Sequence, residues 1–183
     1  MMAMDKMTMD RNLIISIAAL IVIALGGYML YQSIAAQNAN KTEFSSTEHA
    51  VAFAYPEHYI LNERDEGERH TITLLEQAPD PNASEGPPAI TVDIFPNTEG
   101  LTASDWVERT PASNFQLSPD GTLASSTVGG SEAVAYVWDG LYRGESYVFT
   151  HENRIYMLSV TYLDADDQIR EDFTELLQSL RFL

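Results

Sequence analysis

Hydrophobic and polar residues alternate along much of the chain after residue 48, and this pattern predicts strands. Three early segments show the period of two: HAVAFAYP (49–56), HTITLLEQ (70–77) and AITVDIF (89–95). Turn-rich stretches separate them, so we expect the three strands to pair in sequence as an antiparallel meander. The charged segment NERDEGER (62–69) is expected to be an exposed turn.

The second half of the chain carries three more strand patterns: SEAVAYVW (131–138), LYRGESYVFT (141–150) and RIYMLSVTYL (154–163). Asp139-Gly140 stands between the first two and is a hairpin signal. The stretch 112–128 shows no clear period and holds the turn sequence Pro119-Asp120-Gly121, so it is expected to be irregular.

Two segments have helical patterns. In LTASDWVER (101–109), Thr102 is an N-cap candidate and Asp105 follows three residues later, as in a capping box. In DADDQIREDFTELLQSLRFL (164–183), apolar residues form one stripe at helical spacing: Ile169, Phe173, Leu176, Leu177 and Leu180. The chain is therefore predicted to fold as an α+β domain, with a mostly antiparallel sheet of six to seven strands flanked by helices.

A different pattern precedes these elements. The 24 residues from Leu13 to Ala36 contain no charged side chain, and their apolar residues occupy every face of a helix. A helix of this length spans about 36 Å, which is enough for a hydrocarbon core of about 30 Å. We predict a transmembrane signal-anchor helix over 13–36, with a cleaved signal peptide and a buried helix as the alternatives.

The anchor divides the chain into a short N-terminus (1–12), the span (13–36), a polar tether (37–48) and an exported domain (49–183). Lys6 and Arg11 precede the span and Lys41 follows it, a small bias that favours an inside N-terminus. We expect a single-pass protein of a prokaryotic cytoplasmic membrane. Its partner there is the lipid bilayer, and its C-terminal domain is extracytoplasmic.

The negative charge of the chain is concentrated in the predicted exported domain. Of the 27 acidic residues, 25 lie after Lys41, against 7 of the 10 basic residues. Such an acidic domain argues against nucleic-acid binding, which requires a basic surface. The absence of Cys excludes disulfides and thiolate chemistry.

The domain resembles the PsbP-like family, which includes the photosystem II extrinsic protein PsbP and related bacterial proteins. The resemblance rests on five segments taken in order: AVAFAYPEHYI (50–60), LTASDWV (101–107), VGGSEAVAY (128–136), RIYMLSVTY (154–162) and DFTELLQSLRF (172–182). It implies a layered α+β fold and a binding or assembly role rather than catalysis. It implies no catalytic residues, because no shared motif can be aligned.

Candidate chemistry is sparse. No cofactor motif is present, and no Ser, His and Asp stand in a context that marks a catalytic triad. His49, His58 and His70 could converge with Glu48 or Glu57 as nitrogen and oxygen ligands of a divalent metal. The alternative is that these histidines are exposed residues at strand ends. Acids at 164–167 faintly suggest a calcium loop, but helix capping explains them better.

Aromatic residues are concentrated in the late strands. Tyr136, Trp138, Tyr142 and Tyr147 are candidates for a partner surface, since aromatic side chains are enriched at interfaces. Packing within the sheet is the alternative. Two functions follow as hypotheses: a noncatalytic, membrane-anchored module that binds a protein partner, or an extracytoplasmic hydrolase or small-ligand or metal-binding protein with its site in a sheet–helix groove.

Overall fold

The computed structural model describes residues 40–76 and 86–183. The chain divides into two compact units, and the second, Thr42–Leu183, contains nearly all the described residues. The predicted span Leu13–Ala36 lies outside the described residues. Within the ranges 40–76 and 86–183, no helix has the length and apolar character needed to cross a bilayer.

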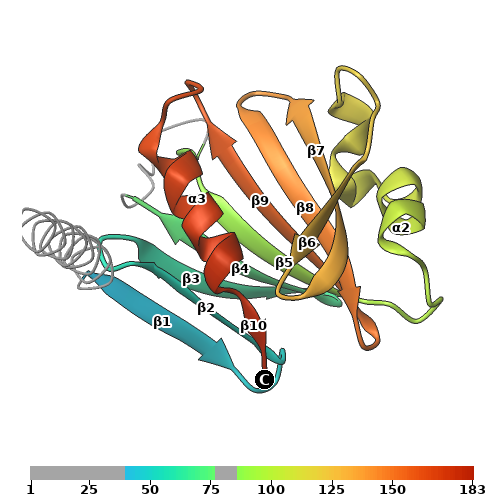
Figure 1. Cartoon of the computed structure of the whole chain (residues 1–183), viewed down its shortest axis with the longest axis horizontal. Helices are drawn as coiled ribbons and strands as arrows, with labels where there is room; N and C mark the ends of the chain where they lie inside the picture. The colour runs from blue at the N-terminus through green and yellow to red at the C-terminus, as the bar shows by residue number, and fades with distance from the viewer. Residues whose placement is uncertain (1–39, 77–85) are drawn as a thin grey trace, which may run out of the picture. The chain divides into compact units, whose positions relative to one another are not determined.

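A seven-stranded sheet forms the centre of the second unit, in the order β3-β4-β5-β9-β8-β7-β6, and each neighbouring pair is antiparallel (Figure 1). Its strands are β3 (Ile60–Glu66), β4 (Arg69–Leu75), β5 (Ile90–Pro96), β6 (Ala124–Val128), β7 (Ser131–Asp139), β8 (Arg143–His151) and β9 (Arg154–Tyr162). The predicted antiparallel α+β fold is therefore confirmed. The hairpin at Asp139-Gly140 is also confirmed, with Asp139 paired to Arg143.

A second, three-stranded sheet has the order β1-β2-β10, formed by β1 (Lys41–Ser46), β2 (Val51–Pro56) and β10 (Arg181–Phe182). Two expectations are corrected here. The tether expected over 37–48 contains a strand, and β2 leaves the predicted meander to pair with β10, Val51 opposite Phe182. The partner strand β10 has only two residues and lies at the other end of the chain, so the sequence around β2 does not indicate this pairing.

The meander is instead built by β3, β4 and β5. The segment NERDEGER was expected to be a turn, yet only its centre turns, at Gly67 with φ of 65°. The flanking residues pair in register, Asp65 opposite His70 and Glu66 opposite Arg69. β6 likewise replaces part of the stretch 112–128 that was expected to be irregular. The strands β3 and β6 are the two edges of the large sheet. One side of an edge strand has no backbone partner, and its side chains are commonly polar.

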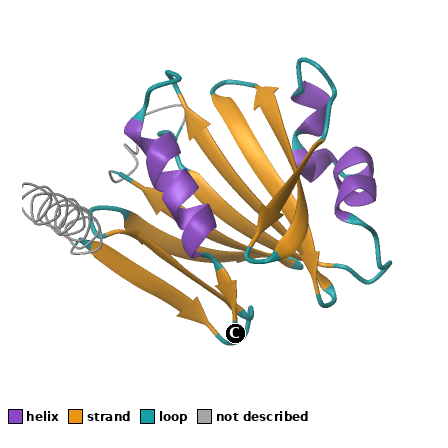
Figure 2. Ribbon diagram, viewed as in Figure 1, coloured by secondary structure: helices purple, strands orange, loops and turns teal. Residues whose placement is uncertain are grey.

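The helix α2 (Ala103–Arg109) begins where the capping box predicts. The backbone N–H of Asp105 donates to the Thr102 hydroxyl at 3.1 Å, and that hydroxyl donates to the Asp105 carboxylate at 2.8 Å. Two short 3₁₀ turns follow, η1 (Pro111–Ser113) and η2 (Phe115–Leu117). Together they cover one face of the large sheet (Figure 2).

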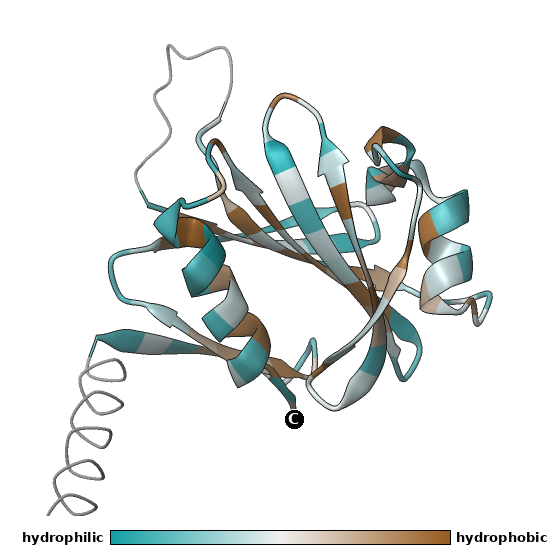
Figure 3. Ribbon diagram, turned by 45° about the horizontal axis from the view of Figure 1, so that its top comes forward, coloured by the Kyte–Doolittle hydropathy of each residue, from teal (hydrophilic) through white to brown (hydrophobic). Residues whose placement is uncertain are grey.

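The helix α3 (Gln168–Ser179) covers the opposite face together with the small sheet (Figure 1). Its predicted stripe is confirmed, because Ile169, Phe173 and Leu176 are buried. Asp167 occupies the N-cap, but its carboxylate accepts from the backbone N–H groups of Leu163 and Asp164 rather than from the helix. In Figure 3, α3 alternates between hydrophobic and hydrophilic residues, as an amphipathic helix must.

Two apolar clusters result, one on each face of the large sheet. The first joins α3 and β2 to side chains such as Tyr156 and Leu158, and the second joins α2 to Ile155 and Met157. Successive residues of β9 thus enter opposite clusters, because side chains alternate across a strand. This explains why both faces of the last predicted strand are apolar.

Candidate functional site

The three candidate metal-binding histidines do not converge on one point. His49 and His70 come together, with their rings stacked at 3.8 Å between centroids and 20° between planes. The nitrogen lone pairs of an imidazole lie in the ring plane, so two stacked rings do not point at a common ion. His58 belongs to another cluster, described below.

Acidic side chains of β3 surround His70. Its Nδ1 lies 2.7 Å from Oδ1 of Asp65, and its Nε2 lies 3.3 Å from Oε2 of Glu63. The second contact is within ion-pair distance but lacks hydrogen-bond geometry, so Nε2 is buried without a hydrogen-bond partner among the described residues. A groove of about 210 Å³ adjoins the pair. Partial burial lowers the pKa of His49, and the neighbouring His70 lowers it further.

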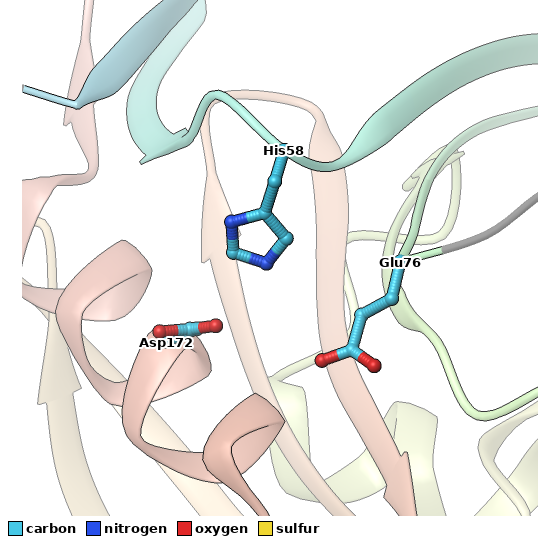
Figure 4. Close-up of side chains that lie close together, drawn as sticks. All are labelled: His58, Glu76 and Asp172. Atoms are coloured by element: carbon cyan, nitrogen blue, oxygen red, sulfur yellow. The ribbon is translucent and has the colours of Figure 1, made fainter.

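A second cluster joins three side chains from separate parts of the chain (Figure 4). His58 lies in the turn between β2 and β3, Glu76 follows β4, and Asp172 lies in α3. One nitrogen or oxygen atom from each lies within 4.8 Å of the others. His58 and Glu76 are exposed, whereas Asp172 is only 6% exposed.

Asp172 is held in place by neighbouring donors. The hydroxyl of Tyr59 donates to Oδ2 at 2.8 Å, and Nε2 of Gln168 donates to Oδ1 at 3.2 Å. Burial raises the pKa of Tyr59 well above its usual value, and the hydrogen bond to Asp172 raises it further. Tyr59 therefore remains a neutral donor. A groove of about 390 Å³ adjoins the cluster, and Glu76 and Gln168 line it.

The sequence pointed to one member of this cluster only. Glu76 belongs to the predicted strand segment 70–77, and Asp172 lies inside an amphipathic helix, directly before the buried Phe173. Neither has a metal-ligand spacing to another residue. The available signal was an acidic residue on the buried side of a helix, a position that usually holds an apolar side chain.

The four aromatic candidates do not share one surface. Tyr136 is buried in the cluster beneath α2, where its hydroxyl donates to the Ser113 carbonyl at 2.5 Å. Trp138 lies on the same face and donates to Ser146 at 2.9 Å. Tyr147 lies on the opposite face against Phe173, and Tyr142 donates to the Gly86 carbonyl. Packing within the core explains Tyr136. Trp138 lies on the same face of the sheet as Tyr136, Tyr147 lies on the other face, and Tyr142 lies in a loop.

A third groove, larger than the two described above, lies on the α2 side of the sheet and has a volume of about 770 Å³. Most of the polar side chains that line it carry a hydroxyl group: Thr102, Ser104, Ser125, Ser126, Thr127 and Thr150. Such a surface can exchange hydrogen bonds with a polar ligand or a partner backbone. It contributes no cationic side chain and two carboxylates, from Glu132 and Glu152.

Taken together, the antiparallel sheet, the covering helices and the short closing strand define a domain with a PsbP-like fold. The solution structure of cyanobacterial PsbP from Synechocystis is similar, with a TM-score of 0.53 and 14% identity, over 79% of this chain and 94% of that chain. A crystal structure from Bacteroides thetaiotaomicron gives a TM-score of 0.50 at 9% identity. There 79% of this chain is covered, and this chain spans about half the length of that protein (49%). No protein-family profile and no curated protein sequence matches the chain.

Proposed function

We propose that the chain is a noncatalytic binding or assembly module, held at the outer face of a prokaryotic cytoplasmic membrane by the apolar segment Leu13–Ala36. The observation that carries this proposal is the likeness to cyanobacterial PsbP, which extends over 94% of that protein. The resemblance implies a binding role, and the 24-residue uncharged run supplies a means of attachment.

The absence of Cys makes the proposed topology directly testable. Thr174 is exposed on α3, so Thr174→Cys provides a single thiol on the domain, and Thr8→Cys provides one before the span. In intact cells, a membrane-impermeant maleimide is expected to label only Thr174→Cys. Both variants are expected to react after lysis. Labelling of Thr8→Cys alone in intact cells would overturn the proposed orientation.

The binding role calls for a separate measurement. Cross-linking in native membranes, followed by purification in detergent, is expected to recover a stoichiometric protein partner with the full chain. A variant in which an unrelated span replaces residues 13–36 is expected to keep the partner, because the domain carries the interaction. Recovery of the full chain free of any cross-linked protein would count against an assembly role.

A small-ligand carrier is the second candidate, and the hydroxyl-lined groove of about 770 Å³ favours it. A carrier is expected to retain a stoichiometric small molecule through purification. Mass spectrometry of the denatured protein would detect that molecule. Ser126→Leu would fill part of the groove and is expected to reduce its recovery.

A further inference from the structure

Asp172 presents an electrostatic problem. Its side chain is buried, and no Lys or Arg of the described ranges forms an ion pair with it. Two neutral donors, Tyr59 and Gln168, contact its oxygens. A buried carboxylate is normally compensated by an opposite charge or a metal ion. Glu76 adds a second carboxylate next to it, which increases the local demand for a cation.

The donor atoms fit one class of cation. An imidazole nitrogen and carboxylate oxygens together suit zinc and similar divalent transition metals, whereas calcium and magnesium favour oxygen ligands alone. Three protein ligands leave coordination positions for water. The exposure of His58 and Glu76 leaves the cluster accessible to an ion from solution.

The surroundings of Asp172 match those of a metal-ligating carboxylate. Ligating side chains are usually oriented by hydrogen bonds from a second set of residues. Tyr59 and Gln168 supply such bonds, and each Asp172 oxygen keeps a lone pair for an ion. Tyr59 is the residue next to His58, so the same short turn positions a ligand and a supporting donor.

We propose that His58, Glu76 and Asp172 form a binding site for one divalent transition-metal ion, with zinc as its representative. The ion joins the turn after β2, the end of β4 and the second turn of α3. It therefore fastens the helix and the small sheet to the edge of the large sheet. The proposal is independent of the assembly role and of the membrane span.

The test uses the untagged full-length chain in detergent, freed of metal with a chelator and then titrated with zinc chloride. Equilibrium dialysis is expected to give one zinc per chain. Zinc at about 100 times its dissociation constant is expected to raise the Tm by about 5–10 °C. Magnesium at the same concentration is expected to have much less effect.

Three variants locate the site. His58→Ala and Glu76→Gln alter exposed side chains, so both are expected to fold while binding zinc at least tenfold more weakly and losing the Tm increase. Glu57→Gln is the matched control, because it removes an exposed acidic charge next to His58 without removing a ligand. It is expected to behave as the wild type does.

Two results would overturn the proposal. One is a wild-type chain whose Tm and dialysis show no specific zinc binding. The other is zinc binding that His58→Ala leaves unchanged and His70→Ala abolishes, which would assign the ion to the stacked pair His49 and His70.

Discussion

The hydroxyl of Tyr59 donates a 2.8 Å hydrogen bond to the buried carboxylate of Asp172, 113 residues further along the chain. This bond connects the turn before β3 to α3. Because a buried acceptor that loses its donor pays a desolvation cost, Tyr59→Phe is expected to lower the free energy of unfolding by about 1–3 kcal/mol.

Urea denaturation of the metal-free chain measures this loss. Tyr142→Phe is the control, since its hydroxyl donates to the Gly86 carbonyl at an exposed site. Its expected cost is below that of Tyr59→Phe. Equal costs for the two variants would contradict a special role for the buried bond.

The indole of Trp138 lies directly over Gly144 in the neighbouring strand. A Cβ atom added at Gly144 would approach the indole ring to 2.2 Å, whereas one at Gly140 would meet it at an ordinary 3.5 Å. Gly144→Ala is therefore expected to destabilise the domain by about 1–3 kcal/mol. Gly140→Ala is expected to change stability little. Thermal unfolding compares them, and a red shift of tryptophan emission in Gly144→Ala alone would report displacement of Trp138.

Asp93 is a buried acid of β5 whose hydrogen bond from Thr71 measures 2.5 Å. Burial raises the pKa of Asp93, although Thr71 and Arg69 oppose the shift. The folded state therefore holds the proton more tightly than the unfolded state, and this contribution to stability is lost as pH rises above the ordinary value of 3.8. Asp93→Asn is expected to gain stability relative to the wild type between pH 4 and pH 7.

The pKa of Asp120 is shifted in the opposite direction to that of Asp93. Hydrogen bonds from Thr122 lower the pKa of this exposed carboxyl group. Asp120→Asn is expected to lose stability relative to the wild type as pH rises from 2 to 5. Chemical denaturation at each pH measures the free energy of unfolding of Asp93→Asn and Asp120→Asn relative to the wild type. If both differences changed with pH in the same direction, the opposite pKa shifts assigned to Asp93 and Asp120 would be refuted.

We expect His49 to make the stability of the domain sensitive to acid. Because the pKa of His49 is lowered in the folded state, the unfolded state takes up the proton at a higher pH. Stability from this group is present above the ordinary value of 6.5 and is lost as pH falls below it. The groups that act on His49 are His70, Glu48, Arg154 and Asp65. His49→Gln is expected to reduce the fall in Tm between pH 7 and pH 5, and an unchanged fall would contradict this assignment.

The central strands and both helices could be predicted because burial gives their sequences a period. β7, β8 and β9 are rich in apolar residues, which lie on both faces in β9, and α3 carries its stripe. The helix α2 is marked by its N-cap Thr102. The edge strands β3 (ILNERDE) and β6 (ASSTV) are mostly exposed, so their sequences show no alternation of apolar and polar residues. The pairing of β2 with β10 depends on contacts between distant parts of the chain, which no local pattern contains.

The candidate site was less predictable for a similar reason. His58 was recognisable as a metal-binding residue type, but its neighbours Glu76 and Asp172 become neighbours only when α3 packs on the sheet. The expected companions of His58, His49 and His70, paired with each other instead. The sequence pattern groups His58 with His49 and His70, whereas the structure places His58 beside Glu76 and Asp172.

The two apolar clusters on opposite faces of the large sheet share no side chain. We therefore expect local unfolding to release α3 and the small sheet from one face while α2 stays packed on the other. A metal ion bound by His58, Glu76 and Asp172 would slow that opening on its own face only, and amide hydrogen exchange on the two faces would then follow different rates.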